Sequence, residues 1–487
     1  MRRTLMVLAS TSALAATSPA GASEEILRAL LPVPGLQIVA MDPPEQDGGQ
    51  LWITNVAASL PGSSISIGEV RIQPSPGRIE VGLDRLLWRS DSSDGLDIVT
   101  GGTLVFTGLP AATGHADALC ALAGSLKEAR LGRTVVEWGE GRNAAARAGA
   151  RRSQIASLRL SAEPDPEVCA FNGRIDLGEA VAMLPGMSRI ETRGIGLTAD
   201  VPLDLEAARN AAGSARLSIG VEGLERVSGG EVPSFGAARL TLDMQAPAQR
   251  TAGVVFLLRA MASAAAAQPV EQRVMEAWNA IHLLSPQAAL RAESMRLFLP
   301  GIVPTGLVAN FRRAGLSNAR GDLSLELSMA NDRAALRGST SLTGVFDLSL
   351  AAAAATSRIP PEVMREILAD PHATAWRTSV LHLDQAQIDY LDTGMERVVG
   401  DLFGVPAGRL VEEIRDLARR DGAADPFFDR ITEGLAYFLR LAAGGAEMRA
   451  RFAPLTDVRV DLPGDAYDWV ILEGDPSRSM RVEFSEK

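Results

Sequence analysis

The chain has 487 residues, of which 46% are hydrophobic and 22% are charged, and its formal net charge at pH 7 is −11. This composition allows a sizeable packed core and excludes a chain that is disordered along its whole length. The acidic balance argues against a nucleic-acid partner, because binding to phosphates depends on a net basic surface. At roughly 100 to 200 residues per domain, the length predicts two to four domains or one unusually extended one.

Residues 1–22 have the layout of a secretory signal peptide. Two arginines at positions 2 and 3 precede an apolar run over residues 4–16, and an A-x-A cleavage signal ends at Ala22. The apolar run is shorter than the ~20 residues needed to cross a bilayer. We therefore expect cleavage, export to the periplasm and no transmembrane segment in the mature chain, with at most peripheral membrane contact.

Period-two alternation of apolar and polar residues is the clearest signal in the rest of the chain. In residues 321–330, apolar side chains at Leu323, Leu325, Leu327 and Met329 alternate with polar ones. The same alternation predicts strands at residues 65–72, 155–162, 215–221, 238–244, 342–350, 458–462 and 479–484. Such strands bury one face only, which favours antiparallel sheet.

Helical patterns lie between these strands, at residues 251–284, 362–368, 408–420 and 429–443. In the third of them, Leu410, Val411, Ile414 and Leu417 form the apolar stripe of an amphipathic helix. We therefore predict an α+β fold with large, mainly antiparallel β-sheets and interspersed amphipathic helices packed on one face. The predicted division is an N-terminal β-rich half (23–245), a helical connector (246–292) and a C-terminal α+β half (293–487).

The chain has two cysteines, Cys120 and Cys169. In an exported protein this number predicts one structural disulfide, because oxidising compartments favour pairing. Their spacing differs from the C-x-x-C motif of redox-active pairs.

Familiar catalytic motifs are absent from the sequence. It has no H-E-x-x-H zinc motif, no G-x-S-x-G nucleophile elbow and no phosphate-binding loop. The four histidines are scattered and no cysteines are close in sequence, whereas zinc sites usually draw on short-range pairs of these residues. We therefore expect neither a metal nor a cofactor.

Residues 381–400 hold the best local candidates for chemistry, with His382 and Asp389 as acid/base residues of a hydrolase. A β-bulge near Asp384 would bring the apolar residues of this stretch to one face. His382 and Asp389 would then lie about 23 Å apart at ~3.3 Å per residue. Residues 393–396 fit the S/T-x-x-E capping box at the start of a helix. We favour a bulged strand that leads into a capped helix over a catalytic cluster.

A basic cluster lies within residues 142–152, which contain no acid. Its members are Arg142, Arg147, Arg151 and Arg152. Guanidinium groups bind phosphate and carboxylate groups with paired hydrogen bonds, so the cluster is a candidate site for an anionic ligand or lipid headgroup. The same composition also fits a solvated connection between two strands.

The cleavable signal, the long alternating strands and the strand-to-helix units of the D-L-x-x-A kind at residues 174–184 and 202–212 resemble β-rich periplasmic proteins of Gram-negative bacteria. More distantly, residues 150–487 resemble AsmA-type envelope proteins, which are associated with lipid traffic. The chain lacks the N-terminal membrane helix that AsmA-type proteins keep.

From the exported, β-rich and motif-free sequence we predict a non-catalytic protein that binds a lipid or other amphipathic ligand, or maintains the envelope. One alternative is a structural or adaptor protein that binds another envelope protein. The other is a hydrolase.

Overall fold

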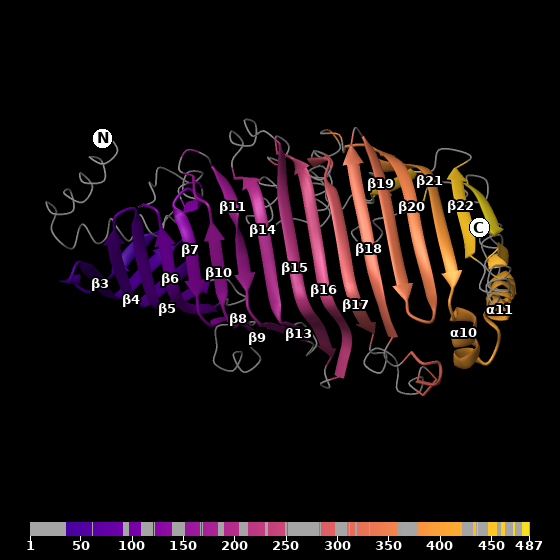
Figure 1. Cartoon of the computed structure of the whole chain (residues 1–487), viewed down its shortest axis with the longest axis horizontal. Coiled ribbons are helices and arrows are strands. Elements are labelled where there is room, and N and C mark those ends of the chain that lie inside the picture. The colour runs from indigo at the N-terminus through magenta and orange to yellow at the C-terminus, as the bar shows by residue number, and fades with distance from the viewer. Residues whose placement is uncertain are drawn as a thin grey trace. The chain divides into compact units, whose positions relative to one another are not determined.

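A computed structural model of the chain shows mainly antiparallel β-sheet (Figure 1). The structure describes residues 36–60, 62–90, 97–108, 120, 122–138, 151–165, 167, 169–183, 189–203, 213–228, 232–248, 251, 282, 284–297, 309–310, 312–316, 319–330, 332–358, 360, 362, 378–420, 432–434, 436, 447–454, 459–462, 471–472 and 480–486. The predicted signal peptide at residues 1–22 lies outside this part of the chain. Two compact units divide the chain, unit 1 (Met1–Ala211) and unit 2 (Ala212–Lys487).

Unit 1 consists of strands that pair in an antiparallel meander. They are β1 (Gln37–Ala40), β2 (Glu45–Asp47), β3 (Gln50–Leu60), β4 (Ser63–Ser75), β5 (Arg78–Ser90), β6 (Asp97–Phe106), β7 (Leu126–Leu131), β8 (Thr134–Trp138), β9 (Arg151–Ile155), β10 (Leu158–Ala162), β11 (Ala170–Leu177), β12 (Ala180–Met183), β13 (Arg189–Thr192) and β14 (Gly194–Pro202). Both β1 and β2 pair with β3, and pairing then follows chain order to β6. There the meander divides into the paths β6–β7–β10–β11–β14 and β6–β8–β9–β12–β13.

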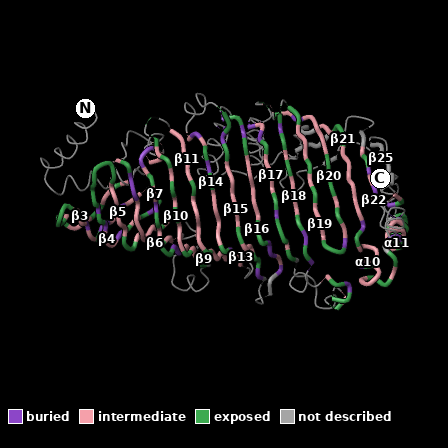
Figure 2. Tube along the Cα trace, in the orientation of Figure 1, coloured by how far each residue is buried: buried purple, intermediate pink, exposed green. Residues whose placement is uncertain are grey.

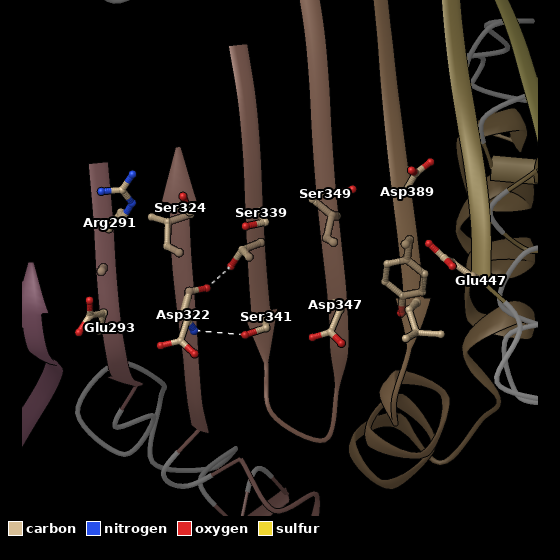
Figure 3. A pocket seen from close by; sticks show the side chains of 16 residues that line it. Arg291, Glu293, Asp322, Ser324, Ser339, Ser341, Asp347, Ser349, Asp389 and Glu447 are labelled. Carbon is tan, nitrogen blue, oxygen red and sulfur yellow. Dashed lines mark hydrogen bonds between the residues drawn. The ribbon is translucent and has the colours of Figure 1, made fainter. Parts of the chain in front are cut away.

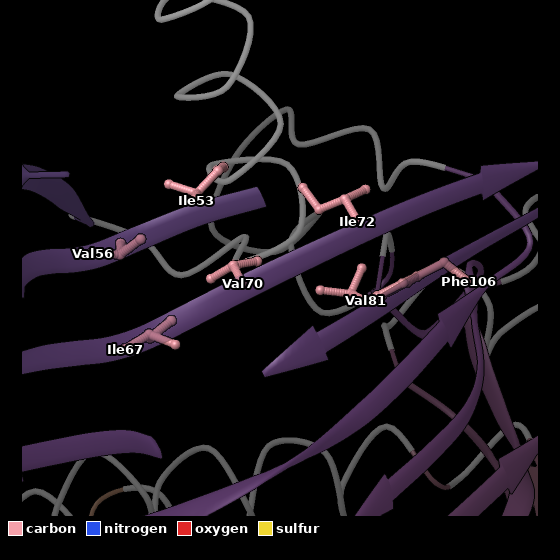
Figure 4. Packing of buried hydrophobic residues seen from close by; sticks show 7 residues of the cluster. All are labelled: Ile53, Val56, Ile67, Val70, Ile72, Val81 and Phe106. Carbon is pink, nitrogen blue, oxygen red and sulfur yellow. The ribbon is translucent and has the colours of Figure 1, made fainter. Parts of the chain in front are cut away.

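Strands β3 to β6 contribute a cluster of almost fully buried apolar side chains in unit 1. Seven apolar side chains from these strands are between 0 and 4% exposed: Ile53, Val56, Ile67, Val70, Ile72, Val81 and Phe106 (Figure 4). One of these strand pairs is bulged, and two residues have left-handed backbone conformations. Asn55 and Arg85 adopt positive φ angles of 53° and 52°, and the β5–β6 register shifts between Leu83 and Leu86. Bulges bend strands and increase their twist, which helps this part of the sheet to enclose a core.

The bending of these strands also depends on Gly102, on β6. Its φ angle is 156°, and a Cβ atom placed there would lie 2.1 Å from the carbonyl oxygen of Arg130 on β7. Only glycine therefore allows β6 and β7 to approach this closely.

Cys120 and Cys169 are paired in unit 1, with their Cα atoms 4.8 Å apart. The predicted pairing of the two cysteines is confirmed. The pair joins the segment before β7 to the start of β11 and closes a separation of 49 residues.

Unit 2 is also built of antiparallel β-strands, with two helices whose bounds are described. Its elements are β15 (Ser214–Ser228), β16 (Val232–Pro247), β17 (Gln287–Leu297), β18 (Ala319–Ala330), β19 (Arg333–Leu342), β20 (Phe346–Thr356), β21 (Thr378–Asp392), α10 (Met395–Phe403), α11 (Ala407–Arg420), β22 (Glu447–Pro454), β23 (Arg459–Leu462), β24 (Ile471–Leu472) and β25 (Met480–Glu486). Strands β15 to β22 pair in chain order. β25 follows β22, and β23 pairs with the first half of β21.

The pairing of β18 with β19 and of β19 with β20 continues without a register shift from Gly321 through Arg333 to Ala355. These strands therefore run side by side as long, regular ribbons (Figure 1). This regularity distinguishes them from the bulged strands β3 to β6.

Several sequence predictions can now be compared with this fold. The mainly antiparallel sheet is confirmed, and the predicted helix at residues 408–420 is α11. The predicted strand at residues 342–350 is wrong in part, because a turn at Thr343–Val345 separates β19 from β20. Residues 180–183, expected to start a helix, form strand β12 because they pair with β9 and β13.

The expected helical connector at residues 246–292 falls mostly on 252–281, which lie outside the described residues. Its last residues, from Gln287 onward, belong to strand β17. The prediction of interspersed helices is confirmed only in part, because α10 and α11 follow one another directly after β21.

Candidate functional site

Strand β21 carries the residues that the sequence singled out for chemistry. Its pairing with β20 skips Asp384, since Ala353 lies opposite Gln385 and Ala354 lies opposite Leu383. The predicted β-bulge is therefore confirmed at Asp384. His382 and Asp389 lie on this one strand, and because the bulge at Asp384 removes one step of ~3.3 Å, their separation is about 20 Å. The structure does not bring them together into one site.

Asp389 makes a cross-strand ion pair with Arg449, which lies directly opposite on β22. The Nε and Nη2 atoms of Arg449 donate to the two carboxylate oxygens at 2.6 and 2.9 Å, and Gln387 donates to both oxygens at 3.2 Å. The bond to Asp389 raises the pKa of the Arg449 guanidinium above its ordinary value. An Asp389 carboxylate bound in this way holds two strands together.

Asp392, at the end of β21, caps helix α10. Its Oδ1 atom accepts hydrogen bonds from the backbone N–H groups of Gly394 and Met395 at 2.7 and 2.9 Å. The predicted capping box, with Thr393 as the capping residue, is therefore wrong. The N-cap is Gly394, which has no side chain to make a cap bond. The buried carboxylate of Asp392 instead binds N–H groups at the start of the helix.

Tyr390 also contacts Asp392 at this end of the strand. Its hydroxyl donates to Asp392 Oδ2 at 3.3 Å. Burial, followed by the negative charge of Asp392, raises the pKa of Tyr390 above its ordinary value. A neutral Tyr390 is therefore part of the folded structure.

The arginine cluster at residues 142–152 lies mostly outside the described residues, which exclude Arg142, Arg147 and the side chain of Arg151. Arg152 is described, and its Nε atom lies 3.3 Å from Oε1 of Glu137 on the neighbouring strand. This one member of the cluster therefore has an acidic partner within the sheet.

The two faces of the sheet in unit 2 differ in the polarity of their side chains. The register aligns apolar side chains in rows across the strands on one face, which we call the apolar face. The central row is Ile219, Leu242, Leu290, Leu325, Gly338, Leu350, Ile388 and Ala450. The flanking rows are Leu217, Met244, Ala288, Leu327, Leu336, Ala352, Ala386 and Phe452, and Val221, Leu240, Ala292, Leu323, Thr340, Leu348, Tyr390 and Met448.

Most large side chains of the apolar face remain partly exposed. Every leucine, isoleucine and valine of the three rows from β15 to β21 is of intermediate burial, and Figure 2 shows these strands largely in the intermediate colour. At the β22 end, Met448 is fully buried against Tyr390, Met395, Val399 and Val411. Helices α10 and α11 therefore cover that end of the apolar face.

The opposite face, which we call the polar face, carries an open groove of about 500 Å³. Two rows of side chains border it across β17 to β22 (Figure 3). One row is Arg291, Ser324, Ser339, Ser349 and Asp389, and the other is Asp322, Ser341, Asp347, Leu391 and Glu447.

The groove offers hydroxyl and carboxylate groups for hydrogen bonding. Several of these groups already have partners within the sheet, such as Asp322, which accepts from the backbone N–H of Ser294 at 2.8 Å. The serines recur at alternate positions in the sequence. Without the strand register, however, nothing in the sequence indicates that they line up.

Within the described ranges, no group of three or more His, Cys, Asp or Glu residues is placed to hold a metal ion. In the same part of the chain, none of the helices combines the length and the apolar character needed to cross a membrane.

No protein-family model, curated protein or solved structure matches the chain. The distant resemblance to AsmA-type proteins therefore stays a prediction from sequence.

Proposed function

We propose that the protein binds an amphipathic ligand, such as a phospholipid, with the acyl chains against the apolar face of unit 2, and that it does so without catalysis. The observation that supports this is the extent of the apolar face. Its rows of large aliphatic side chains cross β15 to β21 and stay partly exposed. Contiguous apolar surface of this kind is rare on soluble proteins unless it binds something.

The energetics favour an apolar occupant. Burying apolar surface contributes about 25 cal/mol per Å² removed from water, so many partly exposed leucines together can hold an acyl chain. A flat row such as Leu242, Leu290 and Leu325 offers no directed hydrogen bond. It therefore suits a ligand whose recognition depends on area and not on specific polar groups.

We further propose that the protein acts in the periplasm. The signal-like N-terminal sequence supports export, and the pairing of Cys120 with Cys169 suits an oxidising compartment. An envelope location would give the apolar face access to phospholipids or lipopolysaccharide.

The test is native mass spectrometry of the gently purified protein, followed by binding assays with a phospholipid panel. The most direct variant is Leu325→Asp, which places a charge in the central row of the apolar face. Its matched control is Ser324→Asp, one residue earlier on the same strand but on the polar face, where Arg291 lies opposite.

We expect the wild type and Ser324→Asp to carry lipid and Leu325→Asp to lose most of it. Circular dichroism and thermal unfolding establish that both variants fold. If the folded wild type carries no lipid and binds none of the panel, the proposal is wrong. Equal lipid content in the two variants would place the ligand elsewhere.

The hydrolase alternative has a separate test. His382→Ala and Asp389→Asn should leave any detected hydrolytic activity unchanged, because Asp389 is bound to Arg449 and lies far from His382. Loss of such an activity in both folded variants would instead support a catalytic role.

A further inference from the structure

Helix α11 presents an apolar stripe that continues beyond the surface on which the helix packs. Val411 belongs to the cluster around Met448, on the sheet. Ile414 and Leu417 follow at the i+3 and i+6 positions of the same stripe, yet they are 47% and 56% exposed. Phe403, the last residue of α10, is 62% exposed. The stripe is therefore anchored at one end and open to solvent at the other.

The charged residues of α11 are arranged around this stripe. The helix carries four arginines, and two of them, Arg419 and Arg420, lie in its last turn beside Leu417. Acids occupy the middle of the helix, where Glu413 accepts from Arg409 at 3.2 Å and Asp416 lies 3.9 Å from Nη1 of Arg419. The end of the helix that exposes Leu417 is therefore its basic end, on a chain whose formal net charge is −11.

We infer that α11 docks on an anionic lipid surface, with Ile414 and Leu417 inserted among the acyl chains and the terminal arginines at the phosphate groups. A helix with a strong apolar stripe, a highly charged opposite side and low overall hydrophobicity is the type that lies in a membrane interface. Arginine suits this position because its long stem can lie along apolar surface while its guanidinium group stays at the headgroups.

The size of the exposed patch favours a lipid surface over a protein partner. Phe403, Ile414 and Leu417 are three side chains, whereas each partner of a stable protein interface contributes about 800 Å². Insertion of a few apolar side chains together with electrostatic attraction is enough for reversible attachment to an anionic membrane.

The docking surface lies next to the proposed ligand-binding face. Val411 packs against Met448, which lies opposite Tyr390 in a flanking row of the apolar face. Figure 1 shows α11 beside α10 at the β22 end of unit 2. A protein attached through α11 would therefore hold that end of the apolar face close to the membrane. The inference itself rests on α11 and not on the proposed function.

Vesicle co-sedimentation of the full chain tests this inference. The probes are vesicles of phosphatidylglycerol mixed with phosphatidylcholine, and vesicles of phosphatidylcholine alone. We expect the wild type to bind the anionic vesicles, and the variant Ile414→Asp/Leu417→Asp to bind them at least about tenfold more weakly. Arg419→Glu/Arg420→Glu should weaken binding in a salt-dependent way.

The matched control is Val39→Asp/Val99→Asp, which adds the same charge at two exposed valines of unit 1, 68% and 42% exposed. It should bind anionic vesicles like the wild type. Wild-type protein that ignores anionic vesicles, or an α11 variant that binds them as well as the control does, would overturn the inference. A dimer that dissociates in the α11 variant, without vesicle binding by the wild type, would also overturn it and assign the patch to a second copy.

Measuring both copurified lipid and vesicle binding distinguishes ligand binding at the apolar face from membrane docking through α11. The folded α11 variant should keep its copurified lipid while losing vesicle binding. Leu325→Asp should show the opposite result.

Discussion

Strands β3 to β6 of unit 1 and strands β18 to β20 of unit 2 have the same alternation of apolar and polar residues but use it differently. In unit 1 a cluster of these apolar side chains is almost fully buried, as at Ile67, which is 1% exposed. In unit 2 the equivalent residues, such as Leu325, stay partly exposed. The two regions differ in their bulges. The β5–β6 ladder of unit 1 shifts register between Leu83 and Leu86, whereas β18 to β20 pair without a register shift.

This comparison indicates that alternation alone does not decide whether a sheet face becomes a core. A bulge bends its strand and increases the local twist, and a bent sheet can bring its own apolar side chains into contact. On the regular strands β18 to β20 the large apolar side chains of this face are only partly buried, so their further burial depends on something else. In unit 2 the helices α10 and α11 provide that cover at one end, and we propose that a ligand provides it over the rest.

The largest expected effect compares the two regions directly. Ile67→Ala should lower the free energy of unfolding by about 2–5 kcal/mol, because it leaves a cavity in a closed core. Leu325→Ala should cost about 1 kcal/mol or less, because a partly exposed side chain loses less burial. Urea unfolding of the delipidated variants measures both values. Equal losses would mean that the apolar face is packed as tightly as the core of unit 1.

The second prediction concerns the bend itself. Gly102→Ala should lower the free energy of unfolding by about 1–3 kcal/mol, because its Cβ would collide with the Arg130 carbonyl in a strained backbone conformation. Gly82→Ala on β5 is the control, since its Cβ would lie 3.6 Å from the nearest atom, Cβ of Arg71. Similar stability of the two variants would contradict the role given to the bend.

The third prediction concerns the covered end of the apolar face. Asp392→Ala should lower the free energy of unfolding by about 0.5–2 kcal/mol, because the first turn of α10 loses its cap. Thr393→Ala should have little effect, because Thr393 is exposed and is not the capping residue. Thermal unfolding of both variants measures the difference. A larger loss for Thr393→Ala would restore the capping box that the sequence suggested.

The smallest expected effect is a dependence on alkaline pH. The pKa of Tyr390 is raised in the folded protein, so the folded state keeps this proton at a pH where the unfolded chain, with an ordinary pKa of about 10, releases it. The stabilisation is complete below that pH and is lost as the pH rises above it. Urea unfolding from pH 9 upward should show a steeper loss for wild type than for Tyr390→Phe. Identical slopes would mean that Tyr390 is not buried against Asp392.

Local sequence patterns predicted the features that depend on neighbouring residues. The parity of Leu323, Leu325 and Leu327 placed them on one face of a strand, and the change of parity in residues 381–390 predicted the bulge at Asp384. The stripe of α11 followed from its spacing in the same way. The capping box failed although it is a local motif, because Asp392 lies just outside it and competes for the same N–H groups.

The tertiary structure decided which distant residues meet and which faces stay open. Asp389 and Arg449 are 60 residues apart, and nothing in either segment indicates that they lie opposite one another. The alignment of serines on the polar face depends on the register of three strands, β18 to β20, in the same way. Periodicity fixes which side of its own strand a residue occupies, because that depends on the backbone alone. Whether that side is covered depends on how strands from separate parts of the chain bend and pair.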